Sequence, residues 1–219
     1  MWICNERVQG VSQELLDLFK DVCPSTIGHM TDFGFVKGLT PLLEDFHFVG
    51  NAVTVQLPHM DGIGIHNAVD VVKEGDVLCV NTCGEYDRAC MGEIVAYAYK
   101  QKKVAAVIID GCITDVKAVR KMGMPVFSKG VSPLTTRSMG IEAAINVPVA
   151  ICGVVVKPGD LVVGDDDGVL VMDPSIAKEF GDKAIAKQNN EPGLKVRIDA
   201  GESLPHINGN CKYYEGIIK

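Results

Sequence analysis

Residues 74–115 read EGDVLCVNTCGEYDRACMGEIVAYAYKQKKVAAVIIDGCITD, and this stretch decides the fold. Its pattern predicts, in order, a strand over Val77–Asn81, a glycine-containing loop, a helix over about Ala89–Gln101, a strand over Val104–Asp110 and an acidic loop over Gly111–Val116. In an open α/β sheet, ligands bind at the carboxyl ends of the strands, and both loops follow such ends. The stretch therefore predicts an α/β fold and the region of its binding site.

Two carboxylates, Glu93 and Asp115, lie beside these loops and are expected to converge. Oxygen ligands of this kind suit a hard divalent cation such as Mg²⁺ or Mn²⁺, which binds carboxylates and water. Each carboxylate also has a structural interpretation, Glu93 as an acidic residue favoured at a helix start and Asp115 as a helix N-cap. Their positions in the sequence fit both interpretations.

Length and composition limit the class of protein. A chain of 219 residues, 47% of them hydrophobic, is long enough to bury the core of one large domain. The formal net charge of −7, without a run of lysine or arginine, argues against non-specific nucleic-acid binding. No apolar run reaches membrane-spanning length, and residues 1–7 lack the features of a secretory signal. We therefore expect a cytoplasmic protein that binds neither membranes nor nucleic acid directly.

The eight cysteines are scattered, with no C-x-x-C pair and no metal-ligand spacing. We interpret most of them as small buried hydrophobic residues in a reducing cytosol. Cys83 and Cys112 flank the loops of the expected site, so thiol reactivity stays open for these two.

The chain before the central stretch predicts helices, one loop and one strand. One helix is expected over Ser12–Val22, and a second begins at a cap formed by Ser25 or Thr26. A loop over Gly34–Glu44, a strand over Phe48–Leu57 and a third helix over Ile63–Lys73 follow. Four polar residues could reach the site, although an exposed or structural role is the simpler interpretation: His29, Asp32, His66 and Asn67.

The chain after the central stretch predicts short strands followed by a helical end. The elements are a helix over Val116–Met122, strands over Pro125–Ser128, Val149–Val156, Leu161–Val163 and Val169–Met172, a helix from Pro174 to about Asn190, an interruption at Glu191–Gly193, a short helix over Leu194–Ala200 and a tail over Asn208–Lys219. The segment Asp165-Asp166-Asp167-Gly168 is interpreted as a hairpin turn, because it lacks the twelve-residue ligand pattern of a calcium loop.

Five motifs, in unbroken order over about Ser25–Asp173, together resemble the RraA-like family. They are Glu74-Gly75-Asp76-Val77-Leu78, Asp87-Arg88-Ala89 with Gly92-Glu93, Ile109-Asp110-Gly111 with Asp115, Met124-Pro125-Val126-Phe127 with Gly130 and Ser132-Pro133, and Gly159-Asp160 with Gly164-Asp165-Asp166-Asp167-Gly168-Val169. This family joins the regulator of ribonuclease activity A with 4-hydroxy-4-methyl-2-oxoglutarate aldolases, which also decarboxylate oxaloacetate.

The resemblance implies a layered β/β/α swivelling-domain fold with mixed sheets. One RraA-like domain would span residues 1–219, with a core over about 25–173, an N-terminal helix and a C-terminal helical extension. It also implies homotrimers or homohexamers with sites between subunits.

The resemblance further implies a site for Mg²⁺ or Mn²⁺ held by Asp115 and Glu93, which would also be the catalytic residues. The 2-oxo acid substrate would meet Gly92 and the backbone N–H groups of Ile94 and Val95. The family's substrate-clamping arginine precedes the metal aspartate, where this chain has Thr114. Threonine offers one neutral hydroxyl in place of a charged fork, so another arginine would have to compensate. The candidates are Arg88, Arg120 and Arg137.

Two functions follow from this comparison. The first is a divalent-metal-dependent carbon–carbon lyase for a small 2-oxo acid, of the aldolase and oxaloacetate decarboxylase type. The alternative is a non-catalytic binding or regulatory oligomer like the ribonuclease regulators, because a fold does not fix a function. Keeping both carboxylates favours the lyase, and losing the arginine favours the regulator.

Overall fold

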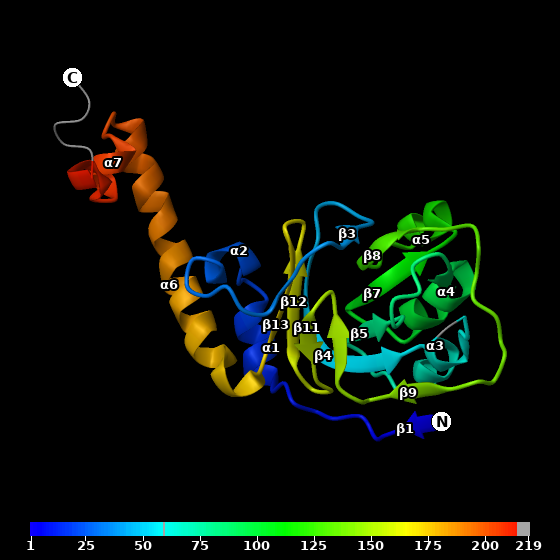
Figure 1. Cartoon of the computed structure of the whole chain (residues 1–219). Helices are drawn as coiled ribbons and strands as arrows, with labels where there is room; N and C mark the ends of the chain where they lie inside the picture. Colours follow the sequence, from blue (N-terminus) through cyan, green and yellow to red (C-terminus); the bar gives the residue numbers. More distant parts are fainter. Residues whose placement is uncertain (59, 214–219) are drawn as a thin grey trace.

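The computed structural model describes residues 1–58 and 60–213, and its central feature is an 11-stranded mixed sheet (Figure 1). Four strands in the middle of the sheet run parallel to one another: β4 (His47–Gln56), β5 (Asp76–Asn81), β7 (Ala106–Ile113) and β8 (Val126–Val131). A short strand, β6 (Ala89–Met91), pairs with the end of β7. Parallel strands bring their carboxyl ends to one edge, so the loops after β5 and β7 meet there, as the sequence predicts.

The sheet continues on both sides with short strands. Beyond β4 lie the antiparallel strands β12 (Leu161–Asp165), β13 (Gly168–Met172) and β2 (Phe35–Val36), and β3 (Thr40–Pro41) pairs with β8 at the other edge. β9 (Ala143–Ile145) pairs with β4 and with β1 (Trp2–Cys4), while β10 (Val149–Ile151) and β11 (Val154–Val156) form a separate hairpin. The long strand β4 joins the two halves, because its start pairs with β12 and its end with β5.

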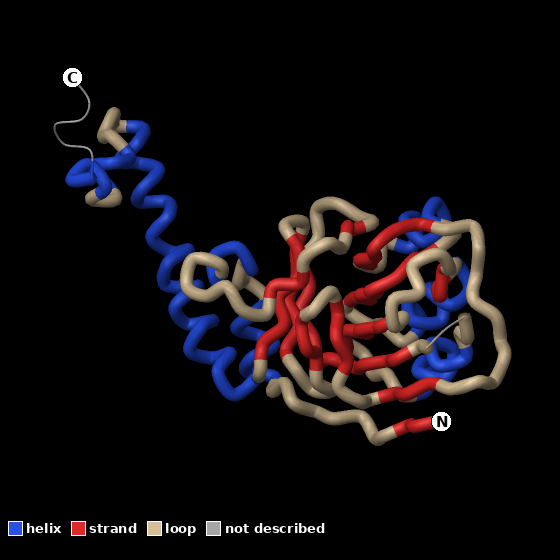
Figure 2. The backbone as a smooth tube through the Cα atoms, in the orientation of Figure 1, coloured by secondary structure: helices blue, strands red, loops and turns tan. Residues whose placement is uncertain are grey.

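Side chains that alternate along the strands build the layers. Helices α3 (Ile63–Asn67), α4 (Glu93–Gln101) and α5 (Val116–Met122) cover one face, where Tyr99 packs with Val107 and Ile109. The β10–β11 hairpin covers the other face, where Ile151 packs with Ile108. A third layer, made of α1 (Gln13–Phe19), α2 (Pro24–Ile27) and α6 (Pro174–Asp199), packs on β12 and β13. Figure 2 shows these helices at two ends with the strands between them.

Two boundaries near the expected site differ from the prediction. Ala89–Met91 is a strand, where the sequence predicts the start of a helix, because Ala89 pairs with Cys112 across an extended β7. The same extension places residues 111–113 in β7, so the acidic loop between β7 and α5 shrinks to Thr114 and Asp115. A register shift between Ile109 and Cys112 accompanies the extension. The predicted helix over Val116–Met122 is confirmed.

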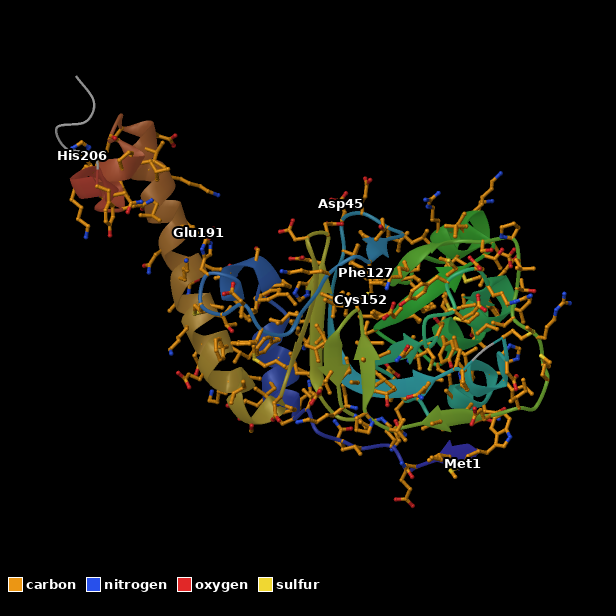
Figure 3. The ribbon with its side chains drawn as sticks, viewed as in Figure 1. Met1, Asp45, Phe127, Cys152, Glu191 and His206 are labelled. Carbon is orange, nitrogen blue, oxygen red and sulfur yellow. The ribbon has the colours of Figure 1, made fainter. Side chains whose placement is uncertain are left out.

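The predicted interruption at Glu191–Gly193 is wrong, because α6 runs without a break to Asp199 and includes Pro192. Proline removes one helical N–H donor, and the carbonyl left without this partner can be hydrated where the helix is exposed. Glu191, Pro192 and Gly193 are all exposed. The outer half of α6 and α7 (Leu204–Ile207) project from the body as an arm that carries Glu191 and His206 (Figure 3).

Several smaller differences concern where elements begin and end, and for the strands among them the hydrogen-bond partners lie in other segments of the chain. The first residue of α2 is Pro24 and its N-cap is Cys23, so neither Ser25 nor Thr26 is the cap. The helix from Ile63 ends at Asn67 and continues as a 3₁₀ turn over Ala68–Asp70. The expected loop over 34–44 contains β2 and β3, the strand over 125–128 extends to Val131, and the run over 149–156 is a hairpin.

The acidic turn over 165–168 and the C-terminal end of the chain were also predicted from the sequence. Asp165 pairs with Gly168, and an Asp165 carboxylate oxygen accepts a hydrogen bond from the backbone N–H of Asp167 at 3.0 Å, so the predicted hairpin turn is confirmed. Within the predicted tail, residues 210–213 form a 3₁₀ turn and residues 214–219 lie outside the described chain. None of the helices in residues 1–58 and 60–213 is long and apolar enough to cross a membrane.

Candidate functional site

Asp115 stands in the short connection between β7 and α5, in a left-handed backbone conformation with φ 53° and ψ 33°. Aspartate tolerates this conformation better than most residues with a side chain. The residue holds the N-cap position of α5, but its side chain caps nothing in that helix. Instead, its Oδ2 accepts a hydrogen bond from the backbone N–H of Glu93 at 3.0 Å. The carboxylate therefore faces the start of the neighbouring helix α4, and the simple N-cap interpretation of Asp115 is wrong.

Gly92 makes this approach possible. A Cβ atom at this position would lie 2.5 Å from Oδ2 of Asp115 and 3.0 Å from Cγ2 of Thr114. Gly92 is the N-cap of α4 and has no side chain to cap the helix itself. The first N–H groups of a helix have no hydrogen-bond partner inside the helix. Here the Asp115 carboxylate is the acceptor for one of these groups, the N–H of Glu93.

The two carboxylates occupy the boundary between two cavities. The smaller, of about 220 Å³, is lined by His66, Ala89, Cys90, Gly92, Glu93, Ile94, Val95, Thr114, Asp115, Thr135 and Thr136. The larger, of about 720 Å³, is lined by Glu93, Tyr97, Lys100, Asp115, Val116, Lys117, Ala118, Lys121 and Met122. Only Glu93 and Asp115 belong to both sets, so a ligand in either cavity would meet this pair. Both residues are exposed.

The smaller cavity brings together the six residues that the family resemblance implies for the metal and the substrate: Gly92, Glu93, Ile94, Val95, Thr114 and Asp115. Arg137, one of the three arginines that could compensate for Thr114, is not among them. Its backbone forms a bridge with Asp61, and its side chain does not line the cavity. His66 lines the cavity and Asn67 does not, while Asp32 lines a separate cavity of about 580 Å³ beside β2 and the β10–β11 hairpin. His29 follows α2, in the layer that contains α6.

The cavity also contains residues that the sequence reasoning missed, namely Ala89, Cys90 and the hydroxyl residues Thr135 and Thr136. The loop over residues 134–137 is tied to β6, because Ala89 N–H donates to the Leu134 carbonyl at 2.8 Å and Thr136 N–H donates to the Ala89 carbonyl at 3.0 Å. The run of hydroxyls before Arg137 was the available signal, but Ala89, the residue with which Thr135 pairs, is 46 residues away in the sequence.

The same loop is tied to the start of α3. Arg137 N–H donates to the Met60 carbonyl at 2.7 Å, and Gly62 N–H donates to the Arg137 carbonyl at 2.9 Å. Asp61, fully buried between them, accepts hydrogen bonds from the backbone N–H groups of Ile63 at 3.1 Å and Ile141 at 2.6 Å. These bonds connect the loop to the start of α3, the helix that carries the cavity-lining residue His66.

The two thiols beside the site, Cys83 and Cys112, both have a raised pKa. Burial and the neighbouring carboxylates of Asp87 and Glu85 raise the pKa of Cys112, and desolvation and Glu142 raise the pKa of Cys83. Reactive cysteines have a lowered pKa, because the thiolate is the nucleophile. The pKa directions therefore favour inert thiols at both positions.

A second polar cluster lies on the hairpin side of the sheet. Lys129 Nζ donates to Oδ1 of Asp110 at 2.6 Å and lies 4.1 Å from the ring centre of Tyr86. Asp110 Oδ2 accepts from the backbone N–H of Cys152 at 2.7 Å, which ties the hairpin to β7. Burial raises the pKa of Asp110, but Lys129 and the Cys152 N–H outweigh it, and the pKa lies below its usual value. Phe127 and Cys152 mark this part of the molecule in Figure 3. The Asp110–Lys129 pair is charge-balanced and connects β7 with β8 and with the hairpin.

Comparison with known proteins identifies the family. The RraA-like family model, described as aldolase/RraA, matches residues 14–171. A protein of Halalkalibacterium halodurans named "Putative 4-hydroxy-4-methyl-2-oxoglutarate aldolase" is 34% identical over 160 residues, which cover 73% of this chain and 76% of that protein.

Two solved structures share the fold. A crystal structure of an uncharacterized protein from Pseudomonas syringae pv. tomato matches with a TM-score of 0.79 and 25% identity, over 91% of this chain and 98% of that one. Streptomyces coelicolor RraAS2, titled an unusual member of the RNase ES inhibitor RraA protein family, matches with a TM-score of 0.77 and 30% identity, over 85% of this chain and 99% of that one. The predicted layered α/β fold of the RraA-like type is therefore confirmed, and the chain belongs to the RraA-like family.

Proposed function

We propose that this protein is a divalent-metal-dependent carbon–carbon lyase that acts on a small 2-oxo acid, of the 4-hydroxy-4-methyl-2-oxoglutarate aldolase or oxaloacetate decarboxylase type. The observation that carries the proposal is the position of Asp115, whose carboxylate turns from its own helix toward Glu93 at the boundary of two cavities. The name of the Halalkalibacterium relative supports the same reaction class.

The residues at the site fit Mg²⁺ or Mn²⁺. Asp115 and Glu93 offer carboxylate oxygens on an exposed rim, and no group of three or more His, Cys, Asp or Glu residues within residues 1–58 and 60–213 is placed to hold an ion. Mg²⁺ keeps several waters and is commonly bound through one or two carboxylates together with substrate oxygens. A two-carboxylate site therefore suits this ion better than ions that need a complete set of protein ligands.

The chain's own residues then bind and orient the substrate. Asp115 Oδ2 accepts a hydrogen bond from the Glu93 N–H, which ties this carboxylate to the start of α4. Ile94 and Val95 lie in the first turn of α4, where free N–H groups and the helix dipole favour an anionic carboxylate. Thr114 adds one neutral hydroxyl at the cavity wall. A bound divalent ion would supply Lewis-acid polarisation of the 2-oxo group as the carbon–carbon bond breaks.

The test is decarboxylation of oxaloacetate by the purified protein with Mg²⁺ or Mn²⁺, with and without a chelator. Turnover that needs the metal and exceeds the rate of the metal alone supports the lyase. Absence of turnover across a panel of 2-oxo acids, including 4-hydroxy-4-methyl-2-oxoglutarate, would refute it. We also propose a homotrimer or homohexamer, and light scattering that gave the mass of a monomer at micromolar concentration would contradict this assembly.

A non-catalytic regulatory oligomer is the second candidate function. Two observations favour it, namely Thr114 at the place of the family's arginine and the similarity to RraAS2, whose title places it in a family of RNase inhibitors. This function predicts no turnover on the panel and inhibition of a ribonuclease in a direct RNA-cleavage assay. The two assays together distinguish the candidates.

A further inference from the structure

The smaller cavity lacks the positive charge that an anionic substrate needs. Its eleven lining residues include two carboxylates, Glu93 and Asp115, and neither lysine nor arginine. Removing an anionic carboxylate from water without a compensating donor is unfavourable. The first-turn amides of α4 and the hydroxyls of Thr114, Thr135 and Thr136 supply neutral donors only.

None of the three arginines that could compensate for Thr114 lines the smaller cavity within the described chain. Arg88 Nη1 donates to the Thr135 carbonyl at 3.0 Å. Arg120 Nε donates to the Leu42 carbonyl at 3.2 Å and lines a different cavity beside β3. Arg137 does not line the smaller cavity either.

Among the described residues that line the cavity, His66 is the one whose side chain has a nitrogen donor. It is exposed, and no hydrogen bond or ion pair engages its ring within residues 1–58 and 60–213. Its helix is held at its start and at its middle, because Asp61 Oδ1 accepts from Ile63 N–H at 3.1 Å and the buried Tyr99 hydroxyl donates to the Ile65 carbonyl at 2.5 Å. Tyr99 belongs to α4, so the bond couples His66 to the helix that begins at Glu93.

We propose that His66 is a substrate-binding residue that donates a ring N–H to the carboxylate of the 2-oxo acid, in the place that Thr114 cannot fill. The inference rests on the proposed lyase function and deepens it. Glu93 and Asp115 face the metal side of the substrate, and His66 on α3 meets its carboxylate from a second wall of the same cavity.

The experiment measures two quantities for each variant, the steady-state kinetics of oxaloacetate decarboxylation with Mn²⁺ and the calorimetric affinity for oxalate, a non-reacting 2-oxo acid mimic. His66→Ala should raise KM and the oxalate Kd about tenfold and change kcat less, because the lost contact is present in the bound substrate as well as in the transition state. His66→Gln, which keeps an N–H donor, should recover part of the loss. Asn67→Ala is the matched control, since Asn67 is exposed on the same helix and does not line the cavity, and it should leave both quantities within twofold.

A double variant tests whether His66 and position 114 share one role. Thr114→Arg in the His66→Ala background should restore oxalate binding to the level of the unmodified protein. Unchanged oxalate affinity in His66→Ala, or failure of the double variant to regain binding, would overturn the inference. The proposed function is judged separately. If the unmodified protein binds oxalate through His66 but turns over no 2-oxo acid, the lyase fails and the His66 contact stands, whereas absence of both turnover and oxalate binding overturns both.

Discussion

The carboxylate of Asp115 accepts a hydrogen bond from the backbone N–H of Glu93 at 3.0 Å, so the residue before α5 supplies the missing cap of α4. One side chain thereby ties the starts of two helices together and places the Asp115 carboxylate beside the backbone of Glu93. The proposed metal site depends on this contact, and the following predictions test it.

Gly92→Ala should disrupt the site from within. The new methyl group would lie 2.5 Å from Oδ2 of Asp115, so the carboxylate must move. Overpacking of this kind costs about 1–3 kcal/mol of unfolding free energy, and Mn²⁺ affinity should fall about tenfold or more. Gly193→Ala is the control, because nothing lies within 4 Å of that position in α6, and alanine in a helix interior is favoured over glycine by about 0.5–1 kcal/mol. Urea denaturation and calorimetry measure both effects, and a Gly92→Ala protein with normal Mn²⁺ affinity would contradict the geometry.

Two replacements at Asp115 should separate its charge from its hydrogen bond. Asp115→Asn keeps an oxygen that accepts from the Glu93 N–H, while Asp115→Ala removes both functions. Mn²⁺ and Mg²⁺ affinity should fall sharply in both variants, because a hard cation needs the charge. Only Asp115→Ala should also lower the unfolding free energy, by about 0.5–2 kcal/mol for a lost cap. Unchanged calorimetric Mn²⁺ binding in both variants would show that the metal assignment is wrong.

Thr114→Arg should improve oxaloacetate decarboxylation. Thr114 lies beside Asp115 and lines the smaller cavity, with its N–H bonded to the Met91 carbonyl at 2.9 Å. A guanidinium there would stabilise negative charge that develops on the substrate, and such donors contribute about 2.7–4 kcal/mol in other enzymes. The gain in kcat/KM should be smaller, about tenfold, because the surrounding residues accommodate threonine. Asn189→Arg on the exposed part of α6 adds the same charge away from the cavity and should have no effect. A fall in kcat/KM with Thr114→Arg would indicate a different substrate pose.

Acid should weaken the contact between Asp110 and Lys129. The pKa of Asp110 is lowered in the folded protein, so its contribution to stability is present above the unfolded value of about 3.9 and is lost as the pH falls through the folded value. Asp110→Asn should therefore lower the unfolding free energy at neutral pH by about 1–3 kcal/mol, since the Asp110 side chain is 8% exposed and Lys129 would lose its partner. The difference from the unmodified protein should shrink below about pH 4 in urea denaturation. If the difference in unfolding free energy between Asp110→Asn and the unmodified protein stayed constant with pH, the contact between Asp110 and Lys129 would not be its cause.

The sequence predicts what depends on local periodicity. The parallel strands β5 and β7, the helix over Val116–Met122 and the hairpin at Asp165–Gly168 all follow from patterns within a few residues. Their order places Glu93 and Asp115 at one edge of the sheet, and the structure brings them into contact.

The rest of the site depends on distant partners and is not visible in the sequence. Ala89–Met91 becomes a strand only because β7 extends past Ile109, and Thr135 and Thr136 reach the cavity only because their loop bonds to Ala89. The left-handed conformation of Asp115 likewise has no local signature, although it decides where the carboxylate points.

The three lysines of the larger cavity bear on how an anionic substrate would approach Glu93 and Asp115. Lys100, Lys117 and Lys121 line the larger cavity, directly behind the two acids, in a protein with a formal net charge of −7. An anionic 2-oxo acid is repelled by most of such a surface, and a local group of lysines gives it one attractive approach. The association rate should therefore depend on this cavity and fall as salt screens it over a Debye length of about 8–10 Å. Under the proposed lyase function, the larger cavity would be the electrostatic entrance and the smaller one would hold the reacting 2-oxo acid.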